Sequence, residues 1–297
     1  MNDTAPASKD FSRLRREGHR RGSSFAIGRA FVLARDALAR GLVRAGVTPN
    51  MLTLAGAVWT LIAAACLLPG AADSWSAAVS AGRWPWPFFA GLALFAASAC
   101  DMLDGAVARL GALSTPLGAV LDSSLDRLSD MAIYLAIATH FAWKGNVTYA
   151  LLAMIALCNA TLISYVKARS ETLIPDCSVG YWLRGERSAA LLIAAFASHI
   201  PAVLWQQALL TIFTVWARLK WTYDVLASQA AGRPAPTAGS FTGWRRYLTP
   251  WRFPRGSLPY DLVTGANIGW ILFAPLIWPA ADGSTDPLRE FIIRWRV

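Results

Sequence analysis

The chain contains few cysteines. Only Cys66, Cys100, Cys158 and Cys177 occur in 297 residues, and no two of them have the short spacing of a zinc site. The first three lie inside apolar segments, where cysteine commonly packs as a small hydrophobic residue. We therefore expect packing cysteines, and neither a disulfide framework nor a zinc site.

The sequence also lacks the pattern of a cleavable secretory signal and shows no internal repeat. Its first 22 residues are basic and polar, and no apolar core with a small-residue cleavage site follows at signal-peptide spacing. We expect residues 1–22 to form a basic cytoplasmic tail.

Apolar residues, in contrast, are abundant. They make up 55% of the chain, and the mean hydropathy is +0.39. They occur in blocks of roughly 20 residues, the length that crosses the hydrocarbon core of a bilayer. The pattern predicts an all-α polytopic membrane protein with six transmembrane helices. The six blocks lie near residues 51–68, 87–107, 117–138, 147–166, 189–204 and 208–221.

An amphipathic helix is predicted before the first block, over residues 23–46. Apolar side chains such as Phe31 and Leu38 recur there near helical spacing, with arginines such as Arg35 between them. We expect this helix to lie in the headgroup plane of the membrane. A solvated helix of a small soluble head is the alternative.

The formal charge of +10 reflects lysines and arginines placed beside the apolar blocks and at the two ends. Anionic lipid headgroups and a phosphorylated substrate explain this placement better than nucleic acid, which we do not expect as a partner. The loops predicted on one side carry only Arg83 and Lys144, so we place the opposite side in the cytoplasm. We expect a multi-pass protein of the cell (inner or plasma) membrane, with its active site facing the cytoplasm.

The composition changes after residue 224. Residues 225–297 form an extension rich in Trp, Arg and Pro, which suits a membrane interface. Its apolar run at 268–281 is short and contains Pro275 and Pro279, so we expect an interfacial or re-entrant segment and no seventh span. The six predicted spans are thus placed in one domain, residues 47–224.

Four acidic residues flank the connection between the second and third blocks: Asp101, Asp104, Asp122 and Asp126. The first two are three residues apart and the last two four apart, so each pair points to one side of its helix. Antiparallel packing of the two helices would bring the pairs face to face. Carboxylates near a membrane are costly without a compensating cation, and oxygen ligands without His or Cys favour Mg²⁺ or Mn²⁺. We expect two divalent ions, Mg²⁺ with Mn²⁺ as the alternative.

Small residues and an arginine accompany these acids. Gly105 and Ala108 leave room for a nucleotide beside the helix, and Arg109 offers a forked donor to phosphate. Taken singly, either small residue is better explained by close helix packing, but that explanation does not account for the two together beside four acids and an arginine.

The string D-x2-D-G-x2-A-R-x8-G-x3-D-x3-D, which begins at Asp101 and includes Gly118, resembles the signature of the CDP-alcohol phosphatidyltransferase family. All eight fixed positions match. The resemblance implies that Asp101, Asp104 and Asp122 bind two metal ions with help from Asp126, which is also the general base. It implies contacts to the CDP moiety of CDP-diacylglycerol from the remaining motif residues, together with Asn50 and Thr53 at the start of the first span. These motif residues are Gly105, Ala108, Arg109 and Gly118. A homodimer is expected by resemblance only.

A second cationic group is predicted on the same side of the membrane, where it suits a phosphate on the acceptor alcohol. The segment that begins at Ser164 is similar to a part of the inositol phosphate pocket in bacterial phosphatidylinositol phosphate synthases. The departures are Leu183 and Gly185, where those enzymes usually have Glu and Pro. The expected acceptor-phosphate residues are Ser164, Lys167, Arg169, Arg184, Arg187 and Arg218. Each cation taken alone is also explained by the excess of positive charge in cytoplasmic loops.

The resemblance implies transfer of a phosphatidyl group to inositol 1-phosphate, with release of CMP. Glycerol 3-phosphate is the second choice of acceptor, and a neutral alcohol such as inositol or serine is the third. A divalent-cation transporter is the alternative from another class, because intramembrane carboxylates also mark ion pathways. It is disfavoured because the acids cluster at the ends of two spans, beside Gly, Ala and Arg.

Overall fold

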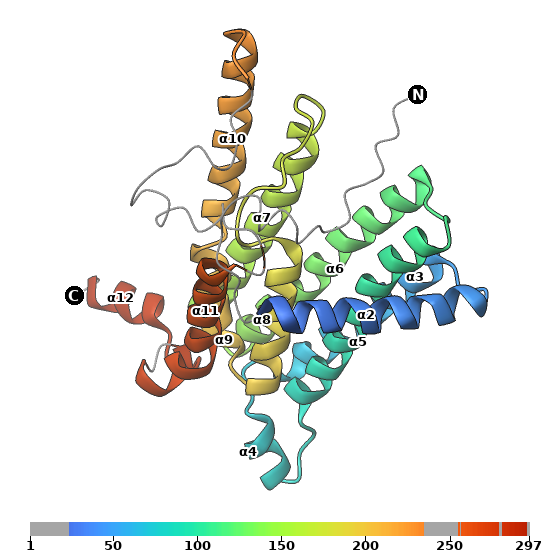
Figure 1. The fold of residues 1–297 in the computed structure, drawn as a ribbon. Coiled ribbons are helices and arrows are strands. Elements are labelled where there is room, and N and C mark those ends of the chain that lie inside the picture. The colour runs from blue at the N-terminus through green and yellow to red at the C-terminus, as the bar shows by residue number, and fades with distance from the viewer. Residues whose placement is uncertain (1–23, 235–254, 256, 279–280, 296–297) are drawn as a thin grey trace.

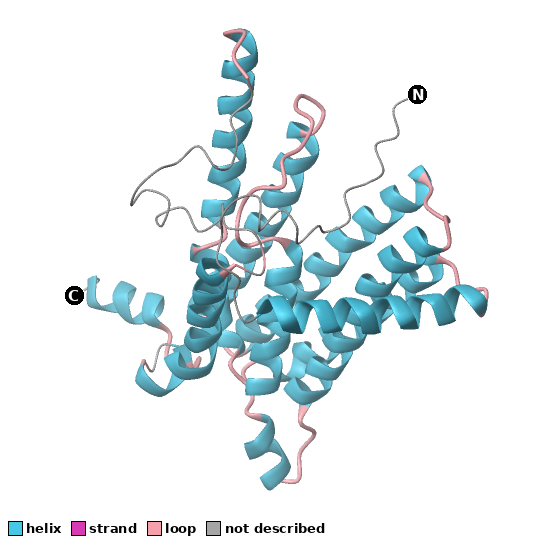
Figure 2. Ribbon diagram, in the orientation of Figure 1, coloured by secondary structure: helices cyan, strands magenta, loops and turns pink. Residues whose placement is uncertain are grey.

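The computed structural model describes residues 24–234, 255, 257–278 and 281–295. Every regular element in these ranges is a helix, which confirms the predicted all-α class (Figure 2). The predicted basic tail, residues 1–22, and the Trp- and Arg-rich cluster at 244–252 lie outside the described residues. The helices are α2 (Ser24–Arg44), α3 (Pro49–Gly70), α4 (Trp75–Ser80), α5 (Trp86–Leu110), α6 (Pro116–Trp143), α7 (Val147–Ser170), α8 (Arg184–Ala197), α9 (Ile200–Leu209), α10 (Ile212–Ala230), α11 (Leu258–Ile277) and α12 (Pro287–Trp295).

Helices α3, α5 and α6 form the part of the bundle that carries the acids. The turn between α5 and α6 is short, and Thr115 caps α6 by accepting a hydrogen bond from the Gly118 backbone N–H at 3.0 Å. Helix α3 packs against both α5 and α6. Its Gly56 lies so close to α5 that a Cβ there would stand 3.3 Å from the Cβ of Cys100. The expected direct packing of α5 against α6 is therefore wrong: the two acid-bearing helices each pack on α3 and make little contact with one another.

Five helical segments of the described chain are long and apolar enough to cross a membrane. Those that match predicted spans are α3, α5, α7 and the combined segment Ile200–Ala230. Helix α6 covers the predicted third span, but its N-terminal half contains Asp122, Asp126, Arg127 and Asp130. The protein is therefore a polytopic helical membrane protein, and the count of six spans stays a prediction.

The predicted fifth span, residues 189–204, is wrong as one continuous helix. Helix α8 ends at Ala197, and Ser198 follows in the left-handed region with φ of 61°. Helix α9 starts at Ile200 with Pro201 in its first turn, where a missing N–H costs nothing. A left-handed residue followed by proline is a common helix terminator, so Pro201 was the signal in the sequence.

The C-terminal extension also differs from the expectation. Its apolar helix α11 begins ten residues before the predicted run 268–281 and is itself a candidate span, so the shortness argument against a seventh span was wrong. Helix α11 packs against α8 and α9. The Trp270 indole donates to the Ala202 carbonyl at 2.9 Å, and a ring nitrogen of His199 lies 2.8 Å from the Ile271 carbonyl oxygen. Helix α12 packs against α7.

The predicted amphipathic segment forms helix α2, which runs crosswise to α6, α7 and α10 (Figure 1). It packs on α5, where Ala39 is fully buried with Ala106 and Val107. The main core lies among α3, α5, α6, α7, α8 and α9 and is rich in alanine, which allows helices to approach closely. Of the cysteines expected to be packing residues, Cys66 and Cys177 are buried, Cys100 is partly buried and Cys158 is exposed.

Candidate active site

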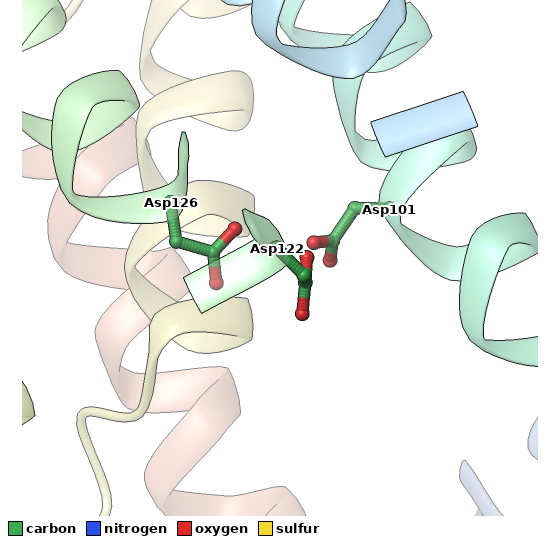
Figure 3. Close-up of side chains that lie close together, drawn as sticks. All are labelled: Asp101, Asp122 and Asp126. Atoms are coloured by element: carbon green, nitrogen blue, oxygen red, sulfur yellow. The ribbon is translucent and has the colours of Figure 1, made fainter. Parts of the chain in front are cut away.

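Three of the four predicted acids converge. Carboxylate oxygens of Asp101 from α5 and of Asp122 and Asp126 from α6 lie within 4.8 Å of one another. Figure 3 shows the side chains directed toward a common point between the two helices. The i,i+4 spacing places Asp122 and Asp126 on one face of α6, and the short turn after α5 sets Asp101 opposite them. The oxygen-only donor set fits a hard divalent cation such as Mg²⁺ or Mn²⁺.

The fourth acid, Asp104, lies in the same cavity but has a protein partner. Its Oδ2 accepts a hydrogen bond from the Thr53 hydroxyl of α3 at 2.9 Å, and the residue is buried. Thr53 was expected to contact the nucleotide, and here it orients an acid of the motif. Packing of α3 against α5 therefore fixes the position of this carboxylate.

Arg184, the first residue of α8, is the counter-ion of the cluster. Its Nη1 lies 2.8 Å from Asp126 Oδ1 and also donates to Asp101 Oδ1. Burial alone would lower the pKa of Arg184, but the carboxylates of Asp101, Asp126 and Asp130 together raise it, so the guanidinium stays charged. One cation thus bridges the acids of α5 and α6.

A cavity of about 590 Å³ opens beside the acids, between α3, α5, α6, α8 and α11. All four motif acids line it, together with Arg184. Farther along the same helices its wall is apolar and includes Leu94, Ile133, Leu191 and Ile271. Leu94 lies seven residues from Asp101 and Ile133 eleven from Asp122, so the cavity extends roughly 10–16 Å from the acids at 1.5 Å per residue. Its shape suits a ligand with a charged end and an apolar body.

The residues expected to contact the CDP moiety lie at the turn end of α5 and α6. Gly118 faces Asn50 of α3, because a Cβ on Gly118 would stand 3.1 Å from the Asn50 amide oxygen. A Cβ on Gly105 would lie 3.3 Å from the Arg109 guanidinium, so the small residue leaves space beside that cation. Of the expected nucleotide contacts, Thr53 lines the cavity, and the lining does not include Gly105, Ala108, Arg109, Gly118 or Asn50.

The expected acceptor-phosphate residues are not brought together in the cavity. Arg184 lines it, whereas Ser164, Lys167, Arg169, Arg187 and Arg218 are not in its lining. Arg187 is 2% exposed, and its Nη2 lies 2.6 Å from Asp130 Oδ2. Arg218 is also buried and donates to the carbonyls of Val179 and Ile163. Lys167 pairs weakly with Glu171, at 3.7 Å, near the surface.

Several residues of the cavity were not assigned to the site from the sequence, among them Asp130, Glu186, Arg255 and Tyr260. Asp130 carried a signal, because it continues the spacing of four that joins Asp122 and Asp126. The other three carried none, since Arg255 and Tyr260 are distant in sequence and reach Glu186 only through tertiary packing.

This arrangement is that of a helical membrane protein whose clustered carboxylates could hold a divalent cation at the charged end of a cavity. The family model for CDP-alcohol phosphatidyltransferases matches residues 46–222, so the chain belongs to the CDP-alcohol phosphatidyltransferase family. It is therefore an enzyme, as predicted, and the transporter alternative is set aside.

Relatives and solved structures agree with this assignment. The chain is 39% identical over 157 residues to the archaetidylinositol phosphate synthase of Methanothermobacter thermautotrophicus, covering 48% of this chain and 78% of that one. It is 35% identical over 181 residues to the phosphatidylinositol phosphate synthase of Mycobacterium bovis, and this match covers 61% of this chain and 77% of the relative. Two crystal structures of phosphatidylinositol phosphate synthase from Mycobacterium tuberculosis are similar to this chain. Each is 28% identical in sequence, and each match covers 64% of this chain. For the structure with CDP-DAG bound, the TM-score is 0.51 and the match covers 93% of that chain. For the structure in complex with manganese and citrate, the TM-score is 0.52 and the match covers 88% of that chain.

Proposed function

We propose that this enzyme transfers a phosphatidyl group from CDP-diacylglycerol to inositol 1-phosphate, giving phosphatidylinositol phosphate and CMP. One observation carries the proposal: the four acids of the family motif and Arg184 line a single cavity whose far wall is apolar. The acids and the cation suit a diphosphate, and the apolar wall suits the chains of a lipid. The inositol phosphate synthases among the relatives support this acceptor.

Asp101, Asp104, Asp122 and Asp126 are the proposed ligands of two divalent ions, Mg²⁺ or Mn²⁺. The cluster of carboxylate oxygens and the manganese in a similar enzyme support this assignment. Bound there, the ions would supply positive charge to the diphosphate and to the departing CMP. Because Arg184 neutralises Asp101 and Asp126 in this structure, we expect its side chain to move toward a substrate phosphate when the carboxylates bind metal.

Asp126 is the proposed general base. The acceptor hydroxyl oxygen forms a bond to the lipid-side phosphorus, the bond from that phosphorus to the oxygen of CMP breaks, and the hydroxyl proton passes to Asp126. Its neighbour Arg184 is a donor within reach of a phosphate oxygen in the same cavity. Positioning and charge stabilisation do most of the work in such a transfer.

We assign the nucleotide to the turn end of α5 and α6, where Gly105, Ala108 and Gly118 keep the helix surface open and Arg109 is exposed. The acceptor phosphate is assigned to Arg184, which lines the cavity. Binding of the acceptor phosphate by the other expected residues stays a prediction; these are Ser164, Lys167, Arg169, Arg187 and Arg218. To bind a phosphate, Arg187 would have to leave Asp130, and Arg218 would have to leave the Val179 carbonyl.

We further propose a cell-membrane location with the acid cluster on the cytoplasmic side, α2 in the headgroup plane, and a homodimer. The positive charge of the loops near the acids and the crosswise direction of α2 support the first two (Figure 1). The homodimer rests on family resemblance alone.

The test is CMP release by the purified protein in detergent with CDP-diacylglycerol and Mg²⁺, using inositol 1-phosphate and glycerol 3-phosphate in separate reactions. Turnover with inositol 1-phosphate is the expected result. Turnover with glycerol 3-phosphate alone would correct the acceptor and keep the reaction, whereas no release with either would refute the proposal.

A further inference from the structure

The C-terminal extension shares the reaction cavity. Helix α11 lies beyond the family match at residues 46–222, yet its Tyr260, Thr264 and Ile271 line the same cavity as the motif acids. Arg255, just before α11, lines it too. A segment outside the family match therefore forms part of the wall that a substrate of this enzyme meets.

Glu186 on α8 holds this wall in place. Its Oε1 accepts hydrogen bonds from Arg255 Nε at 2.8 Å and from the Tyr260 hydroxyl at 2.7 Å, and it lies 2.5 Å from Arg255 Nη2. The Tyr181 hydroxyl donates to Thr264 one turn farther along α11, at 3.0 Å. Three donor groups thus converge on one oxygen of the Glu186 carboxylate.

The other oxygen of Glu186 is unpartnered among the described residues. The side chain is only 10% exposed, and no described residue donates a hydrogen bond to Oε2. The Nε of Arg184 is likewise buried without an acceptor in the described chain. Buried polar atoms are nearly always hydrogen-bonded. Glu186 Oε2 is an acceptor and Arg184 Nε is a donor, and both residues line the same cavity, so a ligand in this cavity would supply the missing partners. Hydroxyl groups suit them, because each can donate to a carboxylate and also accept from a guanidinium.

Hydroxyls belong both to the acceptor alcohol and to the ribose of the CDP donor. The residues assigned to the nucleotide, Gly105, Arg109 and Gly118, are absent from the cavity lining, whereas Glu186 and Tyr260 belong to it. The ribose is therefore expected at the turn of α5 and α6, and the polar end of the cavity beside Glu186 and Tyr260 is left for the acceptor. We propose that Glu186, held by Arg255 and Tyr260 of the extension, binds a hydroxyl of the acceptor alcohol and makes the extension part of the acceptor-specificity site. This inference rests on the proposed function.

The test compares the unmodified full chain with Glu186→Gln, and with Asp73→Asn as a matched control. Asp73 also pairs with a cation, Lys144 at 3.0 Å, but is not in the cavity lining. KM is measured separately for the acceptor that the unmodified protein turns over and for CDP-diacylglycerol. Calorimetric binding of inositol 1-phosphate without the donor is a second readout. Glu186→Asp, which keeps the charge and shortens the side chain, replaces Glu186→Gln if that variant does not fold.

We expect Glu186→Gln to raise the acceptor KM about tenfold or more, the loss typical of a hydrogen bond to a charged group. The donor KM should stay within about twofold, and Asp73→Asn should change neither constant beyond that range. An unchanged acceptor KM refutes the inference, and so does an equal rise in the donor KM, because Glu186 would then serve the ribose or only anchor α11. If the proposed function itself is wrong, the unmodified protein releases no CMP. In that case the calorimetric comparison of the unmodified protein with Glu186→Gln still decides whether Glu186 contributes to binding of inositol 1-phosphate.

Discussion

Replacing Arg187 by Met should destabilise the protein strongly. The Arg187 side chain is 2% exposed and pairs with Asp130 at 2.6 Å, and its Nη1 also donates to the Trp182 carbonyl at 3.3 Å. Removing one partner of a buried ion pair typically costs roughly 3–5 kcal/mol, because the remaining charge is left uncompensated. At about 2 °C per kcal/mol for a chain of this size, the expected fall in Tm is roughly 6–10 °C.

The assay is thermal unfolding of the purified protein in one detergent, followed by intrinsic tryptophan fluorescence. Lys144→Met is the control, since Lys144 and Asp73 form a more exposed pair whose loss should cost about 1 kcal/mol or less. The double variant Arg187→Met with Asp130→Leu should recover most of the lost Tm, because no unpaired charge remains. A fall in Tm for Arg187→Met no greater than that for Lys144→Met would refute the structural role of this pair.

Three other outcomes are expected. Asp126→Asn should lower CMP release by about 10²-fold or more with binding of CDP-diacylglycerol largely kept; near-normal release would remove Asp126 as the base. Chelation by EDTA should abolish turnover and added Mg²⁺ or Mn²⁺ should restore it, and Asp101→Asn should raise the metal concentration needed for half-maximal rate; activity that persists in EDTA would contradict the metal site. Burial alone would raise the pKa of Asp286, but hydrogen bonds from Thr148 and from the backbone N–H groups of Val147 and Arg289 hold it below its usual value. Its stabilising contribution is therefore present above the unfolded pKa of about 3.9 and is lost as pH falls through the lower folded pKa. The Tm difference between the unmodified protein and Asp286→Asn should accordingly be constant from about pH 7 to 5 and shrink below about pH 4; a difference that does not shrink would be inconsistent with this assignment.

Much of the fold could be predicted from local pattern. Helix α7 matches the predicted span at 147–166, because a long apolar block has few alternatives to a helix in a membrane. The break between α8 and α9 was missed, because hydropathy averages over Ser198 and Pro201 and registers no change in backbone direction. The start of α11 was missed for a similar reason: Pro259 and Asp261 lower the apolar signal at its first turn, where Pro is well tolerated and Ser257 caps the helix.

The sequence by itself determined which carboxylates cluster in the candidate site, the ones proposed to bind metal. Asp122 and Asp126 share a face because helix geometry fixes the direction of residues four apart, and the short turn after α5 sets Asp101 opposite them. Tertiary structure alone decided that Arg184, 83 residues from Asp101, neutralises the cluster, and that Tyr260 of the extension reaches Glu186. The physical reason is that helix periodicity acts over a few residues and can be read from spacing. Which helices meet depends instead on the packing of many small contacts, such as Gly56 against Cys100, and no spacing in the chain encodes it.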